Sequence, residues 1–262
     1  MPYSVMLKVN CVWRSKITKK FLHSHNNSHS MERKIFLIVT AGGSGTRMGA
    51  SLPKQFLELE GVPVLQRTIA RFREAVPQLQ IITVLPQDYI SYWKRLCARN
   101  AFNVPQIIVE GGFTRFHSVR NALERVPDGA IVAVHDGVRP LLSVDGIRSL
   151  FAEMETSRAV IPVLPLTDTV KVLDKDGDGR LTESGEKADR SRLYGAQTPQ
   201  IFRSEDLKAA YARGYDTSFT DDASVASAYG IPLSFVAGER YNIKLTTKED
   251  LLLASFILHL SL

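Results

Sequence analysis

Cysteine is scarce in this chain of 262 residues, where Cys11 and Cys97 are the only two. Two cysteines provide neither a disulfide framework nor the ligand spacing of a zinc site, which excludes disulfide-rich scaffolds and fits a reducing cytosol. Long apolar runs are missing too, because no uninterrupted stretch reaches the roughly 18 residues of a transmembrane helix. We therefore expect a cytoplasmic globular protein without a membrane partner.

Acidic residues are absent from residues 1–30, which contain five lysines and arginines. The whole chain has a formal net charge of +6, which leaves only +1 for residues 31–262. The positive charge thus belongs to a tail rather than to a folded domain, and this argues against nucleic-acid binding.

The first thirty residues lack the pattern of a fold. They end in the polar tract 22–30, after which Met31 precedes the first strand-like run. We expect 1–30 to be a disordered extension upstream of a natural start at Met31. A basic transit peptide is an alternative, whereas a secretory signal would need a sustained apolar core. Histidines in the tract could bind a metal, but a disordered tail is the preferred interpretation; they are His23, His25 and His29.

From residue 35 onward, strand-like runs alternate with segments of helical periodicity. Between the runs, apolar residues recur at helical spacing, as in Leu65, Ile69 and Phe72. This order predicts one α/β domain over 31–262, with a mainly parallel sheet covered on both faces. Ligands of such sheets bind beyond the carboxyl ends of the strands. The predicted strands are 35–39, 81–85, 106–109, 130–134 and 159–161.

The alternation breaks between about 165 and 195. Residues 169–173 alternate like a half-buried strand, and 174–179 are typical of a turn. The turn imitates the start of a calcium loop, but Gly185 stands where the bidentate acid belongs, so a hairpin is preferred. We expect this excursion to form a protruding β-arm or a subunit contact.

The most informative segment is the glycine-rich run 40–49, which directly follows the apolar run 35–39. Glycines let backbone N–H groups approach an anion, and Arg47 and Lys54 add two cations, a combination that suits a triphosphate. The glycine spacing is G-x-G-x-x-x-G rather than the dinucleotide pattern, and no Lys-Ser or Lys-Thr completes a P-loop. An ordinary βα turn would explain the glycines but not the cations.

Other polar candidates follow other predicted strands. Asp136 could hold magnesium or a ribose hydroxyl, although a lone Asp more commonly serves as a turn or helix cap. A second glycine-rich loop, 111–118, could recognise a base through backbone groups and the Ser118 hydroxyl, or simply begin a helix. Lys244 lies in an alternating strand pattern that predicts a cleft-facing side chain. His135 is interpreted as structural.

Together these segments resemble the 2-C-methyl-D-erythritol 4-phosphate cytidylyltransferases of the non-mevalonate isoprenoid pathway, over about 35–258. The family implies a Rossmann-like core and an arm that builds a homodimer. It also implies a magnesium-dependent transfer of CMP from CTP to the acceptor phosphate, with release of pyrophosphate. The shared motifs are 41–48, 53–55, 111–119, 134–140, 168–169, 197–200, 220–221 and 242–246.

The resemblance implies roles for single residues. Catalytic cations would be Arg47 and Lys54 at the triphosphate, with Lys244 and a partner-derived Arg190 at the attacking phosphate. No protein nucleophile is needed, because the acceptor supplies its own oxygen and the enzyme holds two anions in line. Nucleotide contacts would come from Ala41, Gly42, Gly43, Gly45, Gly112, Ser118 and Asp136. Asp136 would also bind the metal. Acceptor contacts would come from Gly137, Arg139, Thr169, Thr198 and Thr220.

Phe113 stands where this family often has an acidic residue, which leaves base recognition at that position open. A ribitol 5-phosphate cytidylyltransferase is the alternative with the same mechanism, and Asp189-Arg190 followed by 197–200 favours the methylerythritol family. A catalytically silent nucleotide-binding protein is not expected to keep all four cations. A nicotinamide dehydrogenase would need a different glycine spacing.

Overall fold

A computed structural model describes residues 33–43 and 52–260 of the chain. The expectations for residues 1–30, and the predicted site residues Gly45 and Arg47, lie outside the described residues. Residues Arg33–Leu262 form one compact unit by their internal contacts. Within the described ranges, no helix is long and apolar enough to cross a membrane.

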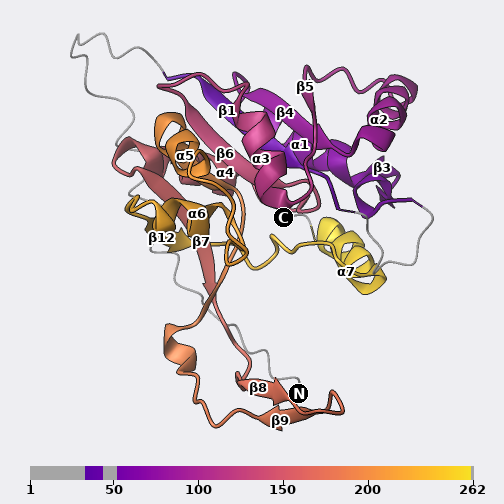
Figure 1. Cartoon of the computed structure of the whole chain (residues 1–262). Helices are drawn as coiled ribbons and strands as arrows, with labels where there is room; N and C mark the ends of the chain where they lie inside the picture. Colours follow the sequence, from indigo (N-terminus) through magenta and orange to yellow (C-terminus); the bar gives the residue numbers. More distant parts are fainter. Residues whose placement is uncertain (1–32, 44–51, 261–262) are drawn as a thin grey trace, which may run out of the picture. The chain divides into compact units, whose positions relative to one another are not determined.

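A central eight-stranded sheet is the framework of this unit (Figure 1). Its strand order is β10–β7–β11–β6–β1–β4–β5, and β12 also pairs with β7. Parallel ladders join β1 to β4 and β6, β4 to β5, and β12 to β7. The mainly parallel sheet expected from the alternation is therefore confirmed. The strands are β1 (Ile35–Thr40), β4 (Gln80–Leu85), β5 (Ile107–Glu110), β6 (Ile131–Asp136), β7 (Ala159–Pro165), β10 (Tyr194–Ala196), β11 (Gln200–Arg203) and β12 (Ser234–Ala237).

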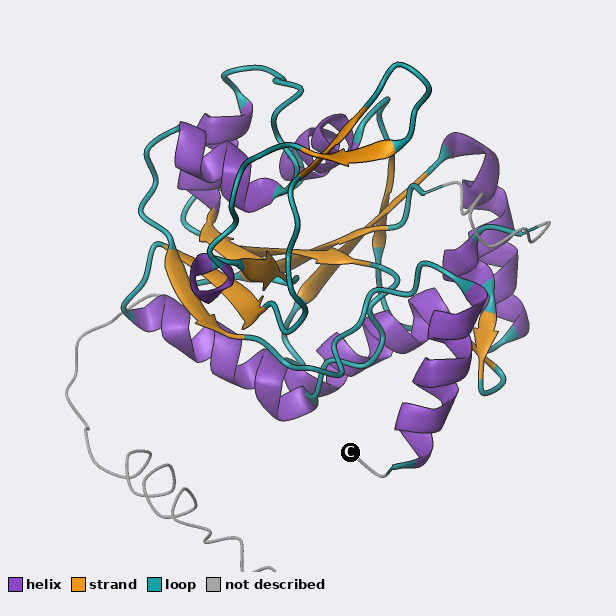
Figure 2. Ribbon diagram, turned by 90° about the horizontal axis from the view of Figure 1, so that it is seen from below, coloured by secondary structure: helices purple, strands orange, loops and turns teal. Residues whose placement is uncertain are grey.

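Two separate apolar cores lie on the two faces of the sheet, because successive residues of a strand point to opposite faces. Phe36 and Ile38 of β1 belong to the core under α3, α5 and α6, whereas Leu37 and Val39 belong to the core under α1, α2 and α4. Figure 2 shows helices on both sides of the central strands. The helices are α1 (Val64–Ala75), α2 (Gln87–Arg99), α3 (Arg115–Leu123), α4 (Val144–Ala152), α5 (Ser204–Tyr211) and α6 (Asp222–Ala228).

A third, smaller core lies beneath the last helix, α7 (Lys248–His259). Ala254 and Ile257 of α7 share this core with Leu59 of the β2–β3 hairpin and with Val138, which follows β6. The hairpin strands are β2 (Glu58–Leu59) and β3 (Val62–Pro63). The packing brings the chain just before α7 next to the end of β6.

Residues 242–246, which include Lys244, do not form the strand that their alternation predicts. They form an extended loop that is fixed to the end of β6 by a hydrogen bond from the Leu245 N–H to the Val138 carbonyl, 2.9 Å long. Leu245 is buried in the third core, which also contains Val138. The expected strand is wrong, whereas the expected cleft-facing Lys244 is found.

The excursion between β7 and β10 contains a two-stranded sheet of its own, β8 (Leu173–Lys175) and β9 (Leu181–Glu183). All six of its residues are exposed, and a 3.1 Å hydrogen bond from Leu166 to Leu193 closes its base. The expected hairpin is present, but the expected strand at 169–173 is wrong. The alternating residues there have no core to pack against, and the pairing of β8 with β9 starts only at Leu173.

The carboxyl ends of the parallel strands meet at one edge of the sheet. Thr40, at the end of β1, pairs in register with Asp136, at the end of β6. Beyond the strands, the Ala41 N–H donates to the Val84 carbonyl and the Gly137 N–H donates to the Thr40 carbonyl, at 3.0 and 2.9 Å. The predicted ligand-binding segments therefore begin side by side.

Candidate active site

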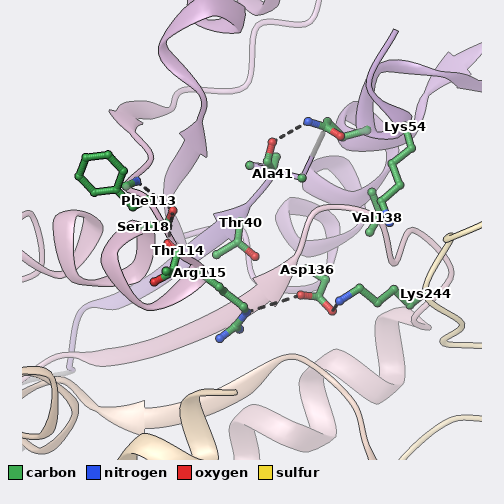
Figure 3. Close-up of a pocket in the computed structure, with 14 residues that line it drawn as sticks. Thr40, Ala41, Lys54, Phe113, Thr114, Arg115, Ser118, Asp136, Val138 and Lys244 are labelled. Carbon is green, nitrogen blue, oxygen red and sulfur yellow. Dashed lines mark hydrogen bonds and ion pairs between the residues drawn. The ribbon is translucent and has the colours of Figure 1, made fainter. Parts of the chain in front are cut away.

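A cavity of about 260 Å³ lies at this edge of the sheet, and Figure 3 shows the side chains that line it. Eight of the predicted site residues are among its lining, namely Ala41, Gly42, Gly43, Lys54, Gly112, Ser118, Asp136 and Lys244. The sequence assigned no role to five other lining residues, Thr40, Gln55, Thr114, Arg115 and Val138, and it flagged the last one, Phe113, as a departure from the family. The cavity thus joins four segments that are far apart in the sequence.

The described start of the glycine-rich loop presents open backbone. A side chain added at Gly42 or Gly43 would meet no atom within 4 Å, so these residues leave room for a ligand. The Gln55 side chain donates a 2.7 Å hydrogen bond to the Ala41 carbonyl and ties the loop to the short 3-10 helix Lys54–Phe56. Lys54 is thereby held beside the loop. Loop amides and a nearby cation suit phosphate oxygens.

The second glycine-rich loop has a defined internal geometry. The Ser118 hydroxyl accepts a 3.0 Å hydrogen bond from the Gly112 N–H and donates a 3.0 Å bond to the Thr114 carbonyl. Position 112 must be glycine, because a Cβ there would lie 2.4 Å from the Cβ of His117. Since the single hydroxyl proton of Ser118 is engaged, its free capacity toward a ligand is that of an acceptor.

Phe113 lies in this loop at the rim of the cavity, with its side chain fully exposed at 102%. Its ring contacts His117 edge-on, with the centroids 6.5 Å apart, and points away from Asp136 (Figure 3). An aromatic side chain offers a nucleobase a face to contact but no polar partner. The sequence flagged Phe113 as a departure but did not predict its exposure.

Asp136 is the electrostatic centre of the cavity, and only 9% of its side chain is exposed. Its Oδ2 lies 3.0 Å from Arg139 Nε and 3.2 Å from Lys244 Nζ, and its Oδ1 lies 4.0 Å from Arg115 Nε. Arg115 and Lys244 approach it from opposite sides (Figure 3). Burial alone would raise the pKa of Asp136, but Lys244, Arg115 and Arg139 outweigh burial and hold it well below its usual range. Asp136 is therefore ionised.

Arg115 is the cation that the sequence did not single out. It is the first residue of α3, and its guanidinium also bonds to Asp222, which is fully buried at the start of α6. Burial alone would lower the pKa of Arg115, but Asp222 and Asp136 raise it above its usual value. Its place in the motif at 111–118 was the available signal, because a cation at a glycine-rich helix entry is itself a candidate anion contact.

His135 is fully buried and takes part in a chain of hydrogen bonds behind Asp136. The Asp136 N–H donates to the Thr198 hydroxyl at 3.0 Å, and that hydroxyl lies 3.0 Å from His135 Nδ1. The other ring nitrogen lies 3.1 Å from the Arg139 carbonyl. Both ring nitrogens thus have protein partners, as a structural role requires. Burial lowers the pKa of His135 to about 4, so the ring is neutral at pH 7.

We expect the free energy of unfolding to decrease by about 2 kcal/mol between pH 7 and pH 5 on account of His135. The unfolded imidazole takes up a proton below its ordinary pKa of 6.5, whereas the folded one does so only near pH 4, so acid favours unfolding. Urea unfolding at both pH values measures the difference. His135→Gln, which keeps a donor and an acceptor, should lose this pH dependence, and the exposed-site control His259→Gln should keep it. Equal pH dependence in all three proteins would contradict the assignment.

Several predicted acceptor residues lie around the cavity rather than in its lining. Gly137 follows Asp136 and must be small, because a Cβ there would lie 2.9 Å from Leu65. Arg139 and Thr198 reach the cavity through their bonds to Asp136. Thr220 is exposed just before α6 and gives its N–H to the Ser224 hydroxyl.

Thr169 and Arg190 belong to the excursion and are not brought to the cavity by this chain. Both are exposed, and the Arg190 guanidinium donates a 2.9 Å hydrogen bond to the Thr167 carbonyl. The described residues predicted to contact the nucleotide thus line one cavity, whereas Thr169 and Arg190 do not line it. Their predicted contacts with the acceptor stay predictions.

The described residues contain no group of three or more His, Cys, Asp and Glu side chains arranged for a metal ion. Among the described residues that line the cavity, Asp136 is the single carboxylate, and its Oδ2 is shared by Arg139 and Lys244. Magnesium is often bound by only one or two carboxylates together with substrate phosphates and water. The donor set therefore fits a magnesium ion that a triphosphate accompanies, with Asp136 as its protein contact.

Comparison with known proteins gives a consistent result. A family model described as 2-C-methyl-D-erythritol 4-phosphate cytidylyltransferase matches residues 35–260. The protein of that name from Porphyromonas gingivalis is 47% identical over 229 residues, covering 87% of this chain and 99% of the relative. One from Bacteroides fragilis is 45% identical over 222 residues, covering 84% and 98%.

Solved structures agree with the sequence comparison. A crystal structure of 4-diphosphocytidyl-2C-methyl-D-erythritol synthase from Anaerococcus prevotii has a TM-score of 0.70 at 28% identity, and the match covers 87% of this chain and 99% of that one. The span of residues matched by the family model contains both glycine-rich loops, Asp136 and Lys244.

Proposed function

The chain belongs to the 2-C-methyl-D-erythritol 4-phosphate cytidylyltransferase family, and we propose that the cavity around Asp136 is where it joins CTP to its acceptor. The protein is a nucleotidyltransferase of the non-mevalonate isoprenoid pathway, which transfers CMP from CTP to methylerythritol phosphate. The ribitol phosphate alternative is not favoured, because the relatives and the structure described above are named for methylerythritol.

One observation carries the proposal for the site, namely the convergence of Lys54 and Lys244 on a single cavity at the carboxyl edge of the sheet. The reaction brings a triphosphate and a sugar-alcohol phosphate together, and these anions repel each other. Fixed cations offset that repulsion without reorganisation during the reaction. The cavity combines such cations with open loop backbone.

The transfer is an in-line displacement at phosphorus. An oxygen of the acceptor phosphate forms a bond to the α-phosphorus of CTP, the bond from that phosphorus to the bridging oxygen breaks, and its electron pair leaves with pyrophosphate. Lys54, together with Arg47, stabilises the charge on the triphosphate. Lys244 orients the acceptor phosphate. Before the acceptor arrives, Lys244 lies 3.2 Å from Asp136, which Arg139 holds at 3.0 Å.

Cytosine selectivity follows from the polarity of Ser118. Its hydroxyl proton is held by the Thr114 carbonyl, so it offers a base only an acceptor. The exocyclic amino group of cytosine is a donor, whereas the corresponding oxygen of uracil is an acceptor. Ser118 thus favours CTP over UTP, and the Gly112 N–H fixes the hydroxyl with a 3.0 Å hydrogen bond.

We propose magnesium as the metal cofactor, with Asp136 as its protein ligand. Bound together with the triphosphate, it would neutralise part of the charge on the phosphate oxygens. The protein would act as a homodimer through the excursion at 165–195, since Arg190 and Thr169 are not among the described residues that line the cavity. The requirement for CTP and the free thiol of Cys97 support a cytoplasmic location.

The proposed function is tested by pyrophosphate release from CTP and magnesium, with methylerythritol 4-phosphate and ribitol 5-phosphate supplied in parallel. We expect release with methylerythritol phosphate alone. Release with ribitol phosphate alone would keep the mechanism and change the acceptor. If a folded sample releases pyrophosphate with neither acceptor, the protein is a silent nucleotide binder.

A further inference from the structure

We propose that Arg115 is a positioning residue that ties Asp136 to the start of α6 and thereby fixes the site of the acceptor phosphate. The inference rests on the proposed function, because it assigns the acceptor phosphate to Lys244. Arg115 lies on the opposite side of Asp136 from Lys244 (Figure 3). Its role is to hold Asp136 in place while Lys244 turns from Asp136 to the acceptor phosphate.

Arg115 connects two carboxylates that belong to different parts of the fold. Its NH2 bonds to Oδ2 of Asp222 at the start of α6, and its Nε lies 4.0 Å from Oδ1 of Asp136 at the end of β6. A planar guanidinium can serve two carboxylates at once, because its N–H groups point in fixed and different directions. A lysine ammonium at the same position is a single point charge.

Asp222 is a fixed anchor for this connection. It is fully buried, and its second oxygen accepts a 2.6 Å hydrogen bond from the Tyr211 hydroxyl. The Tyr211 ring is stacked on Phe116 of α3, with the centroids 4.5 Å apart. Arg115 is therefore held by a rigid assembly of α3, α5 and α6, and it transmits that rigidity to Asp136.

The same start of α6 is fixed from the sheet. The Gln200 side chain donates a 2.7 Å hydrogen bond to Asp221 and accepts a 2.8 Å bond from the Ala223 N–H. Gln200 opens β11, two residues after Thr198, which bonds to the Asp136 N–H. The start of α6 and the end of β6 are thus joined by two routes, of which Arg115 is the charged one.

The arrangement matters when the acceptor phosphate arrives. Lys244 is 45% exposed and its charge is occupied by Asp136, so it must turn from that carboxylate toward the phosphate. Asp136 then keeps Arg139 at 3.0 Å and Arg115 at 4.0 Å. Arg139 is itself fixed to the Asn242 carbonyl at 2.9 Å. With both guanidiniums in place, Asp136 stays where it is and Lys244 remains close to its working position.

Two variants of the full chain separate this role from simple support of the fold. Arg115→Lys keeps a cation for Asp222 but loses the simultaneous contact with Asp136. Arg115→Gln combined with Asp222→Asn replaces the ion pair by a pair of neutral side chains. We expect both to raise KM for methylerythritol phosphate and to lower kcat, each by about tenfold or more. CTP affinity, measured by calorimetry without acceptor and without magnesium, should change by less than about threefold, because Asp136 then has no metal to hold for the triphosphate. Thermal unfolding reports on the fold, and Arg125→Gln, at an exposed position after α3, is the control.

Three results bear on the proposal. A raised KM for the acceptor and a lowered kcat, with CTP affinity retained, support it. Wild-type constants in Arg115→Lys overturn it, and so does an equal loss of CTP affinity, which would make Arg115 a direct triphosphate contact. If the proposed function itself were wrong, the wild-type protein would not turn over methylerythritol phosphate in the same assay. That result differs from each of the three outcomes for Arg115.

Discussion

The Lys54→Ala variant is expected to lose turnover by about 10²–10³-fold while keeping its fold, by analogy with the loss of one transition-state donor. Lys54 begins a 3-10 helix whose next residue, Gln55, is bonded to the Ala41 carbonyl at 2.7 Å. The following Phe56 is buried against Tyr92, with the ring centroids 5.1 Å apart. The ammonium is therefore attached to a rigid element and lines the cavity beside the loop.

The effect should appear in kcat more than in the affinity for CTP. Charge on the leaving pyrophosphate grows toward the transition state, so a fixed cation stabilises that state more than the bound substrate. Arg47→Ala should behave in the same way. Lys94→Ala, at an exposed position of α2, is the matched control and should keep full activity. Turnover within threefold of wild type in both site variants would reject the proposed cation mechanism.

The core elements could be predicted from the sequence because each has a pattern that its packing satisfies. Helix α1 shows the apolar face expected from Leu65, Ile69 and Phe72, and it ends at Ala75, two residues before Pro77. Strands β1, β4 and β6 read as continuous apolar runs, and both of their faces are buried. The strand expected at 169–173 failed because its alternating residues have no core to face. Alternation predicts a strand only where one side of it is buried.

The parts of the candidate site that lie within short sequence motifs could be predicted. Both glycine-rich loops, Asp136 and Lys244 line one cavity, because parallel strands bring their carboxyl ends to one edge. Arg115 escaped prediction because its partner Asp222 lies 107 residues away and meets it only when α3 and α6 pack on the same face. Motifs identify residue types, whereas the pairing of charges depends on the tertiary structure.

The second large effect is expected at Lys244, where Lys244→Gln should raise KM for methylerythritol phosphate by about tenfold and lower kcat by about 10²-fold. Lys244 Nζ lies 3.2 Å from Asp136 Oδ2 at the edge of the cavity, and its side chain is 45% exposed, so it can reach an arriving phosphate. The fold should survive, because Asp136 keeps Arg139 and Arg115 as partners. Steady-state kinetics with each substrate varied separately measures the effect.

Comparison of Lys244→Gln with Lys54→Ala distinguishes a cation that contacts the acceptor from one that contacts the triphosphate. If Lys244 serves the acceptor and Lys54 the triphosphate, the acceptor KM should rise strongly only in Lys244→Gln, and calorimetry should find its CTP affinity within about threefold of wild type. Lys248→Gln, four residues later at the exposed start of α7, is the control for charge alone. Should Lys244→Gln instead weaken CTP binding as much as it raises the acceptor KM, both cations would belong to the nucleotide. The acceptor phosphate would then have to be oriented by other groups, for which we propose Arg139 and, in the proposed dimer, Arg190 of the partner subunit.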